Sequence, residues 1–137
     1  MEITISRIQG SLPVTVLHLR GKLDGNTYET LIAEAQKQYA GGARDLVLDF
    51  SQVTYLSSAG LSALHSVALL FRGQKPSDRQ EGWASFRAIE NDRANGLQEH
   101  VKLLHPTAEV KNVMELVGFN ALFDTYTDIH QAVASFH

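Results

Sequence analysis

The chain has 137 residues, a formal net charge of −3, 44% hydrophobic and 20% charged residues, and no cysteine. This length is typical of one domain with its own core. The net negative charge argues against nucleic-acid binding through a broad basic face, and the lack of cysteine excludes disulfides and thiolate chemistry. We therefore expect a single domain over residues 1–137 that does not bind nucleic acid directly.

The sequence also predicts where the protein works. Residues 1–5 alternate like a strand and lack the basic and apolar regions of a signal peptide. The longest apolar-rich stretch, residues 61–71, contains three polar side chains and is too short to span a bilayer. We expect a cytoplasmic protein with no membrane insertion.

The first half of the chain predicts strands and helices that alternate after an opening hairpin. Isoleucines at positions 3, 5 and 8 indicate a strand with an irregularity near Arg7, and residues 14–20 indicate a second strand that Gly21 ends. Asn26, with Glu29 three residues later, is a candidate N-cap for a helix that stops at Gly41 and Gly42. Residues 45–50 read as a central strand, followed by a buried helix that begins at Ser57 or Ser58 and ends at residues 72–73.

The second half predicts an insert and then two more strand–helix pairs. Residues 74–100 are polar and charged, but Trp83, Phe86 and Ile89 recur every three residues, which indicates a short amphipathic helix. It packs on the domain's own apolar surface or, alternatively, anchors a partner. The remaining predicted elements are a strand at 101–104, a helix capped by Thr107 that ends at Gly118, a strand at 122–126 and a last helix capped by Thr127.

This element order predicts an α/β fold with helices packed on a sheet. In such folds, functional groups gather where strands end and the next helices begin. Two segments occupy such places, residues 21–27 after the second strand and residues 53–61 after the central strand. If these strands are neighbours, Asp24 and Asn26 lie near Ser57 and Ser58.

Three segments of the sequence resemble the STAS family, named for sulfate transporters and anti-sigma factor antagonists. They are DFSQVTYLSSAGLSAL at 49–64, GKLDGNT at 21–27 and ELVGFNALFDTYTDIHQAV at 115–133. The resemblance covers nearly the whole chain except about residues 74–100. It implies the STAS fold, a mixed β-sheet of about five strands with about four helices, here with a helical insert after the second helix.

The resemblance implies a bacterial partner-switching function for a domain of this kind. The unphosphorylated protein binds an anti-sigma factor that is also a serine kinase, and so regulates transcription by freeing a sigma factor. Phosphorylation ends the binding, and a PP2C-type phosphatase restores it. Matching the motif residue by residue makes Ser58 the phosphoacceptor.

The same resemblance implies a partner-binding set around this serine. The set comprises Asp24, Asn26, Thr27, Ser57, Ser58, Ala59 and Leu61. Classical sporulation-type members of the family usually have aspartate immediately before the phosphoacceptor, whereas this chain has Ser57, which makes Ser57 an alternative phosphosite. The residue after Ser58 is Ala59, where many relatives have serine or threonine.

Local structure offers a simpler interpretation of each of these residues. Ser57 and Ser58 could be helix caps and nothing more, and Asp24 and Asn26 could be plain turn and cap residues. Gly60 is interpreted as a packing residue. These structural roles are compatible with partner binding at the same residues.

Other chemistries have little support in the sequence. His100 and His105 are the closest histidine pair, but their spacing suits neither a helical face nor a strand face, so we expect no metal. No phosphate-binding loop, dinucleotide motif or histidine base for Ser58 is present, so we expect neither a cofactor nor an enzyme. A nucleotide-binding hydrolase is disfavoured for the same reason.

The alternative function is a constitutive STAS accessory subunit or scaffold, of a transporter ATPase or a stressosome. The insert at residues 74–100 motivates it, because an extra segment could build a different docking face.

Overall fold

A computed structural model of the chain describes residues 1–73, 98–118 and 122–136. The elements in chain order are β1 (Glu2–Gln9), β2 (Pro13–Leu23), α1 (Tyr28–Ala40), β3 (Leu46–Leu56), α2 (Ser58–Phe71), β4 (Val101–Leu104), α4 (Ala108–Leu116), β5 (Thr125–Tyr126) and α5 (Ile129–Ala134). The predicted insert helix, with Trp83, Phe86 and Ile89, lies outside the described residues.

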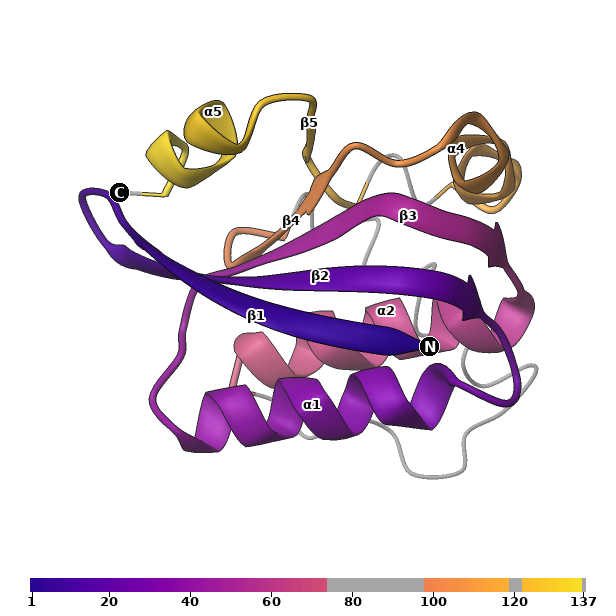
Figure 1. Cartoon of the computed structure of the whole chain (residues 1–137), viewed down its shortest axis with the longest axis horizontal. Helices are drawn as coiled ribbons and strands as arrows, with labels where there is room; N and C mark the ends of the chain where they lie inside the picture. The colour runs from indigo at the N-terminus through magenta and orange to yellow at the C-terminus, as the bar shows by residue number, and fades with distance from the viewer. Residues whose placement is uncertain (74–97, 119–121, 137) are drawn as a thin grey trace.

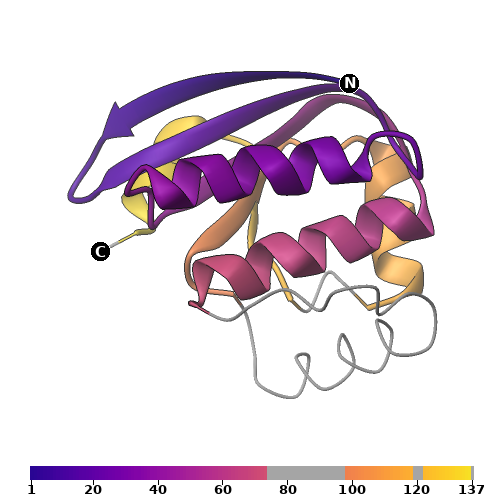
Figure 2. The same ribbon diagram turned by 90° about the horizontal axis from the view of Figure 1, so that it is seen from below.

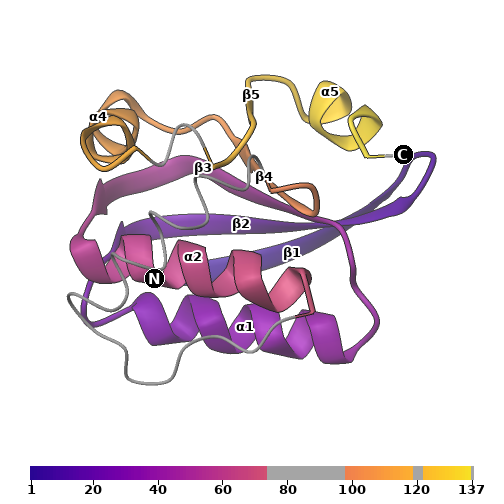
Figure 3. The same ribbon diagram turned by 180° about the vertical axis from the view of Figure 1, so that it is seen from behind.

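The described strands form one mixed five-stranded sheet in the order β1-β2-β3-β4-β5. β1 and β2 pair antiparallel as a hairpin, and the other neighbours pair parallel. Helices α1 and α2 lie side by side on one side of the sheet, and α4 and α5 lie on the other (Figures 1 and 3). The predicted α/β fold, with five strands and four helices among the described residues, is confirmed.

The larger core fills the space between the sheet and the α1–α2 pair, which Figure 2 shows from the helical side. Leu17, Leu48 and Leu64 are fully buried there. Where α1 and α2 end, the rings of Tyr39 and Phe71 meet edge to face with centroids 5.3 Å apart. A smaller core, which includes Val16, Val47 and Phe136, lies under α5.

The predicted irregularity near Arg7 was wrong. Pairing of β1 with β2 is continuous from Glu2 opposite Arg20 to Gln9 opposite Pro13. The isoleucine pattern changes along β1 because Ile3 packs against the larger core and Ile8 against the smaller one. The isoleucine pattern that predicted an irregularity therefore reflects a change in which face of β1 is covered, not a bulge.

Both strands that lead to the predicted site are longer than expected. β2 does not end at Gly21, which has φ +112° and marks a register shift, but continues to Leu23. β3 continues past Phe50 to Leu56 through two register shifts against β2. Such irregularities interrupt the alternation of apolar side chains, which is the signal that predicts strands.

Two predicted caps and one strand are also corrected. Thr27, not Asn26, is the N-cap residue of α1, and it makes no side-chain cap hydrogen bond. Asp128, not Thr127, caps α5 by accepting from the His130 N–H. β5 is shorter than predicted, because the residues that precede it include Leu122 and Phe123, which are buried in the core outside the ladder.

Other predicted boundaries are confirmed. β4 spans residues 101–104 as expected, and α1 ends before Gly41. The Thr107 hydroxyl accepts from the Val110 N–H at the start of α4, and Gly118 has φ +79° after its end. Each rests on a short-range signal, a cap or a glycine in the left-handed region.

Candidate functional site

The carboxyl ends of β2 and β3 lie side by side, as expected. Leu23 pairs with Leu56 at the last position of the two strands, and the Ser57 N–H donates to the Leu23 carbonyl at 3.0 Å. The start of α2 is therefore fixed by a backbone hydrogen bond to the end of β2. This contact brings the loop after β2 next to the two serines.

Ser57 and Ser58 have different environments at the start of α2. Ser57 is the N-cap, with extended backbone, and its Oγ accepts from the Gly60 N–H at 3.3 Å. Its carbonyl accepts from the Leu61 N–H at 3.0 Å. Ser58 is the first helical residue and is exposed to solvent. The structure thus gives the capping contact to Ser57 and leaves Ser58 on the surface.

The loop after β2 is held by its own side chains. The Thr27 hydroxyl donates to the Lys22 carbonyl at 2.7 Å and accepts from the Asp24 N–H at 2.9 Å. Asp24 Oδ1 accepts from the Asn26 N–H at 2.9 Å. Asp24 and Thr27 are half-buried and Asn26 is exposed. The loop therefore has a defined shape beside Ser57, and Asp24 has one carboxylate oxygen in a local turn.

Gly60 permits the close contact of α2 with the end of β2. A Cβ at this position would lie 2.6 Å from the Leu23 carbonyl oxygen and 2.6 Å from Leu56 Cδ1. Real Cβ atoms do not approach a backbone oxygen so closely, so a side chain here would push the helix away. The packing interpretation of Gly60 agrees with this geometry.

Two residues change the predicted surface. Leu61 is only 2% exposed and packs in the larger core, so in this conformation its side chain is not available to a partner. Ala59 is half-buried. Tyr55, near the end of β3, is 42% exposed although it is a large aromatic residue. Sequence reasoning missed Tyr55 because the segment was interpreted as a loop; its position in a strand, pointing away from the core, is visible only with the register.

The first turn of α2 has no acidic residue. The N-terminal amides of a helix carry a partial positive charge that favours anions locally. A negatively charged group on Ser58 would therefore meet attraction from the helix end and no repulsion from its own first turn. Asp24 is the acidic group on the adjacent loop.

His100 and His105, which were predicted not to bind metal, have different surroundings. His100 Nδ1 and Asp45 Oδ1 are 2.9 Å apart at the amino end of the sheet, while His105 is exposed after β4 with φ 50°. Across the described ranges, no group of three His, Asp or Glu residues is arranged to hold a metal ion.

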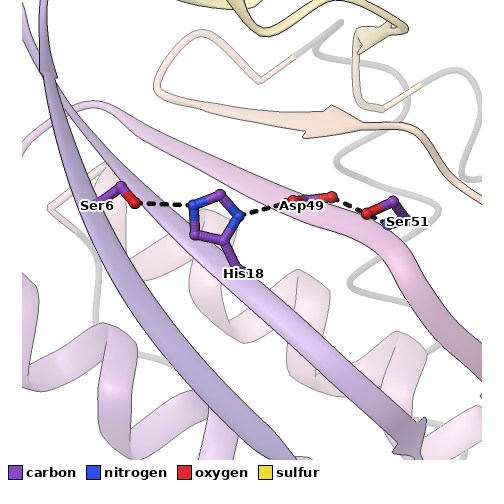
Figure 4. A network of polar contacts seen from close by, with 4 residues as sticks. All are labelled: Ser6, His18, Asp49 and Ser51. Atoms are coloured by element: carbon purple, nitrogen blue, oxygen red, sulfur yellow. Dashed lines mark hydrogen bonds and ion pairs between the residues drawn. The ribbon is translucent and has the colours of Figure 1, made fainter.

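A separate polar network crosses three strands on the side of the sheet opposite α1 and α2. Ser6 Oγ lies 2.9 Å from His18 Nε2, and His18 Nδ1 lies 2.7 Å from Asp49 Oδ2 (Figure 4). Asp49 Oδ1 accepts from the Ser51 N–H at 3.0 Å, at the register shift of β3. These contacts fit a His18 tautomer that donates from Nδ1 and accepts from Ser6.

The network sets the ionisation of Asp49. Burial acts to raise its pKa, but hydrogen bonds from the Ser51 backbone and from His18 outweigh burial and leave the pKa below its ordinary value. Asp49 is thus stabilised as a carboxylate that joins β2 to β3. No sequence pattern indicates this network, because its members are far apart along the chain and only the strand register aligns them.

Comparison with known proteins points to one family. The profile of a domain family described as "Mlab, STAS domain" matches residues 6–77, more than half of the chain. BtrV of Bordetella bronchiseptica, whose name assigns it provisionally as an anti-sigma factor antagonist, is 27% identical over 136 residues, covering 99% of this chain and 95% of BtrV.

Solved structures share the fold. An anti-sigma factor antagonist from Mycobacterium paratuberculosis superposes with a TM-score of 0.64 at 19% identity, covering 98% of this chain and 93% of that one. The anti-sigma factor antagonist SpoIIAA in its unphosphorylated form gives 0.53 at 14% identity, with coverages of 96% and 94%. The Bacillus cell fate determinant SpoIIAA in its phosphorylated form gives 0.53 at 15% identity, with coverages of 95% and 96%.

Proposed function

Because the chain belongs to the STAS domain family, we propose that it is an anti-sigma factor antagonist controlled by phosphorylation of Ser58. The unphosphorylated protein binds an anti-sigma factor that is also a serine kinase, and so regulates transcription. Phosphorylation releases that partner, and a PP2C-type phosphatase reverses the change. The whole chain acts as one cytoplasmic, non-enzymatic domain that needs no cofactor.

The observation that carries the proposal is the difference between the environments of Ser57 and Ser58. Ser57 Oγ is engaged by the Gly60 N–H, whereas Ser58 is exposed one residue later. A kinase needs an accessible hydroxyl. Withdrawing Ser57 Oγ from its capping hydrogen bond to meet a kinase would cost about 1 kcal/mol of helix stability. These facts favour Ser58 over Ser57 as the phosphoacceptor.

The docking face includes the loop after β2 and the exposed end of β3. Asp24, Asn26 and Thr27 lie beside the α2 start through the contact of Ser57 with Leu23. Tyr55 adds an exposed aromatic residue, a type often found at the centre of interfaces. Leu61 is left out of this face because it is buried.

Phosphorylation would change this face without unfolding the helix. A phosphate adds about −1.5 to −2 charges at pH 7. The helix amides tolerate that charge, so α2 keeps its structure. Bulk, hydration and repulsion from acidic groups, on the partner or at Asp24, then oppose docking. Release therefore needs only a local change at the interface.

The proposal is tested with a serine kinase encoded beside this gene. We expect incubation with that kinase and ATP to add one phosphoryl group, seen by intact mass and mapped to Ser58. Ser58→Ala should abolish the modification, and Ser57→Ala should keep it. Phosphorylation of the Ser58→Ala variant, or no modification of the wild type by any neighbouring kinase, would contradict the proposal.

Binding assays distinguish the alternative of a constitutive accessory subunit of a transporter ATPase or a stressosome scaffold. For a partner switch, Ser58→Asp should abolish capture of the anti-sigma factor, with Ser11→Asp, at an exposed serine between β1 and β2, as a matched control. Co-purification with a transporter ATPase that is unchanged by Ser58→Asp would favour the accessory subunit. The name of BtrV assigns it provisionally as an anti-sigma factor antagonist, and two of the solved structures are of anti-sigma factor antagonists, so the partner switch is preferred.

A further inference from the structure

A serine, a histidine and an aspartate meet on the sheet face opposite α1 and α2, in the polar network of Figure 4. Ser6 Oγ lies 2.9 Å from His18 Nε2, and His18 Nδ1 lies 2.7 Å from Asp49 Oδ2. A serine hydroxyl on Nε2 with a carboxylate on Nδ1 of the same ring is the order of contacts in the serine–histidine–aspartate triads of acyl-transfer enzymes. The partner-binding function proposed above makes no use of this arrangement.

The strand register builds the arrangement. His18 pairs directly with Asp49 across β2 and β3, and with Thr4 across β1 and β2. Ser6, two residues after Thr4, is thus the diagonal neighbour of His18 on the same face of the sheet. Because the three side chains project from adjacent strands, their backbone positions are fixed and the His18 ring is held from both sides.

The two contacts of the ring set its tautomer. Burial acts to raise the pKa of Asp49, but hydrogen bonds from the Ser51 backbone and from His18 leave it below its ordinary value, so Asp49 is a carboxylate at neutral pH. A carboxylate only accepts hydrogen bonds, so Nδ1 carries the hydrogen and the Nε2 lone pair faces the Ser6 hydroxyl. In this tautomer His18 can take the Ser6 proton during a nucleophilic attack.

The Ser6 hydroxyl can be reached from solvent. Ser6 is half-buried, and the side chain of His18 is 38% exposed. Helices α4 and α5 lie toward opposite ends of this sheet face (Figures 1 and 3). β1, which carries Ser6, is an edge strand of the sheet. A small molecule can therefore approach the hydroxyl without movement of a helix.

We propose that Ser6 is a nucleophilic serine that accepts an acyl group from small activated carboxylic esters, with His18 as its base and Asp49 as the residue that positions His18. The Ser6 oxygen forms a bond to the carbonyl carbon while its proton passes to His18 Nε2. The bond between the carbonyl carbon and the leaving oxygen then breaks, and the leaving group takes that proton as it departs. The products are an ester on Ser6 and a free alcohol.

The position of Ser6 indicates one transfer per chain rather than turnover. Many hydrolases place their serine on a sharp turn, where backbone N–H groups are free to bind the developing oxyanion. Ser6 instead lies in the middle of β1, whose pairing with β2 is continuous. His18 then speeds the attack, but the ester on Ser6 is expected to persist. The site is therefore a covalent modification site and not the active centre of a hydrolase.

Brief incubation of the full chain with p-nitrophenyl acetate at mildly alkaline pH tests the proposal. Peptide mass spectrometry then separates an ester on serine from acetylated amines. We expect acetylation of Ser6 about a hundredfold faster than that of Ser11, an exposed serine between β1 and β2. Ser6→Ala should remove this product, and Ser11→Ala should react at Ser6 as the wild type does. Equal labelling of Ser6 and Ser11 in the wild type would overturn the proposal.

A second variant separates a base from a structural contact. His18→Gln keeps an amide that can hydrogen-bond to Ser6 and Asp49 but cannot take a proton. Its Tm should stay near that of the wild type, while labelling of Ser6 falls to the rate of Ser11. Labelling of Ser6 at the wild-type rate in His18→Gln would contradict a base at this position.

The positioning role of Asp49 is tested through the pH dependence of labelling. In the wild type, the rate at Ser6 should rise with pH to a plateau as His18 loses its proton. In Asp49→Asn the midpoint of that rise should move to lower pH, because the carboxylate that stabilises a proton on the ring is gone. The plateau rate should also fall. An unchanged profile would overturn the role of Asp49.

Discussion

The two ends of the sheet are built differently. At the carboxyl end, backbone groups meet directly: Ser57 bonds to Leu23, and Gly60 lies where no side chain fits. At the amino end, the strands are also tied by backbone bonds, from Thr15 to Asp45 and from Leu46 to His100, but polar side chains and a cavity lie beside them. The carboxyl end is therefore packed closely through its backbone, whereas the amino end leaves open space beside its strands.

The largest expected effect is at the carboxyl end. Gly60→Ala should destabilise the fold by about 3 kcal/mol, because the new Cβ would meet the Leu23 carbonyl oxygen and Leu56. Urea denaturation measures it. Gly25→Ala is the matched control, since nothing lies within 4 Å of a Cβ there, and it should change stability by less than about 0.5 kcal/mol. Equal losses in the two variants would contradict close packing at Gly60.

The next effect lies between the two ends, at Asp49. Asp49→Asn should cost about 1.5 kcal/mol at neutral pH, because the amide cannot replace both hydrogen bonds of the carboxylate. Since the folded pKa of Asp49 is lowered, its contribution is complete above its unfolded value of about 4 and is lost as pH falls through the folded value.

The measurement for Asp49 is the free energy of unfolding of both proteins across a pH series. The difference between wild type and Asp49→Asn should be constant near neutral pH and should close at acidic pH. A difference that stays the same down to pH 2 would contradict a carboxylate role for Asp49.

A smaller effect separates the two serines. Ser57→Ala should lower stability by about 1 kcal/mol through loss of the N-cap. Ser58→Ala should change it by less than about 0.5 kcal/mol, because this side chain is exposed. Thermal unfolding of the two variants gives the comparison. A larger loss at Ser58 would reverse the assignment of the cap.

The smallest effect is expected at the cavity. Lys102→Met keeps most of the side-chain volume and removes an ammonium that is buried, paired only at 3.9 Å, and held over aromatic rings. Replacing a buried charge by an apolar side chain is often neutral, so stability should change by less than about 1 kcal/mol. A loss of several kcal/mol in chemical denaturation would show that the amino end is packed as tightly as the other.

Sequence predicted the fold and one end of the sheet well, because their signals are local. The α2 start, the Thr107 cap and β4 follow from caps and apolar runs that need no distant partner. The neighbouring strands also bring the loop that contains Asp24 beside the start of α2, as the element order predicts. Local patterns failed where contacts span the chain: the register shifts of β3, the burial of Leu61 and the exposure of Tyr55 depend on neighbouring strands.

The polar groups away from the motifs could not be predicted for the same reason. His18 and Asp49 are 31 residues apart in sequence, and His100 and Asp45 are 55 apart. Their meeting depends on which strands pair and in which register. The residues next to a histidine or aspartate in a strand do not indicate such a distant partner.

The strand order has a consequence for how the protein behaves at high concentration. β1 lies at one edge of the sheet with eight residues, while β5, at the opposite edge, has two. A long open edge is a template for pairing with another chain, and charged side chains on it oppose such pairing. On β1 these charges are Glu2 and Arg7, both exposed. Protection from edge-to-edge aggregation therefore depends mainly on the cost of desolvating two side chains of opposite sign, and because such a pair gives no net repulsion between copies, we expect added salt to change it little.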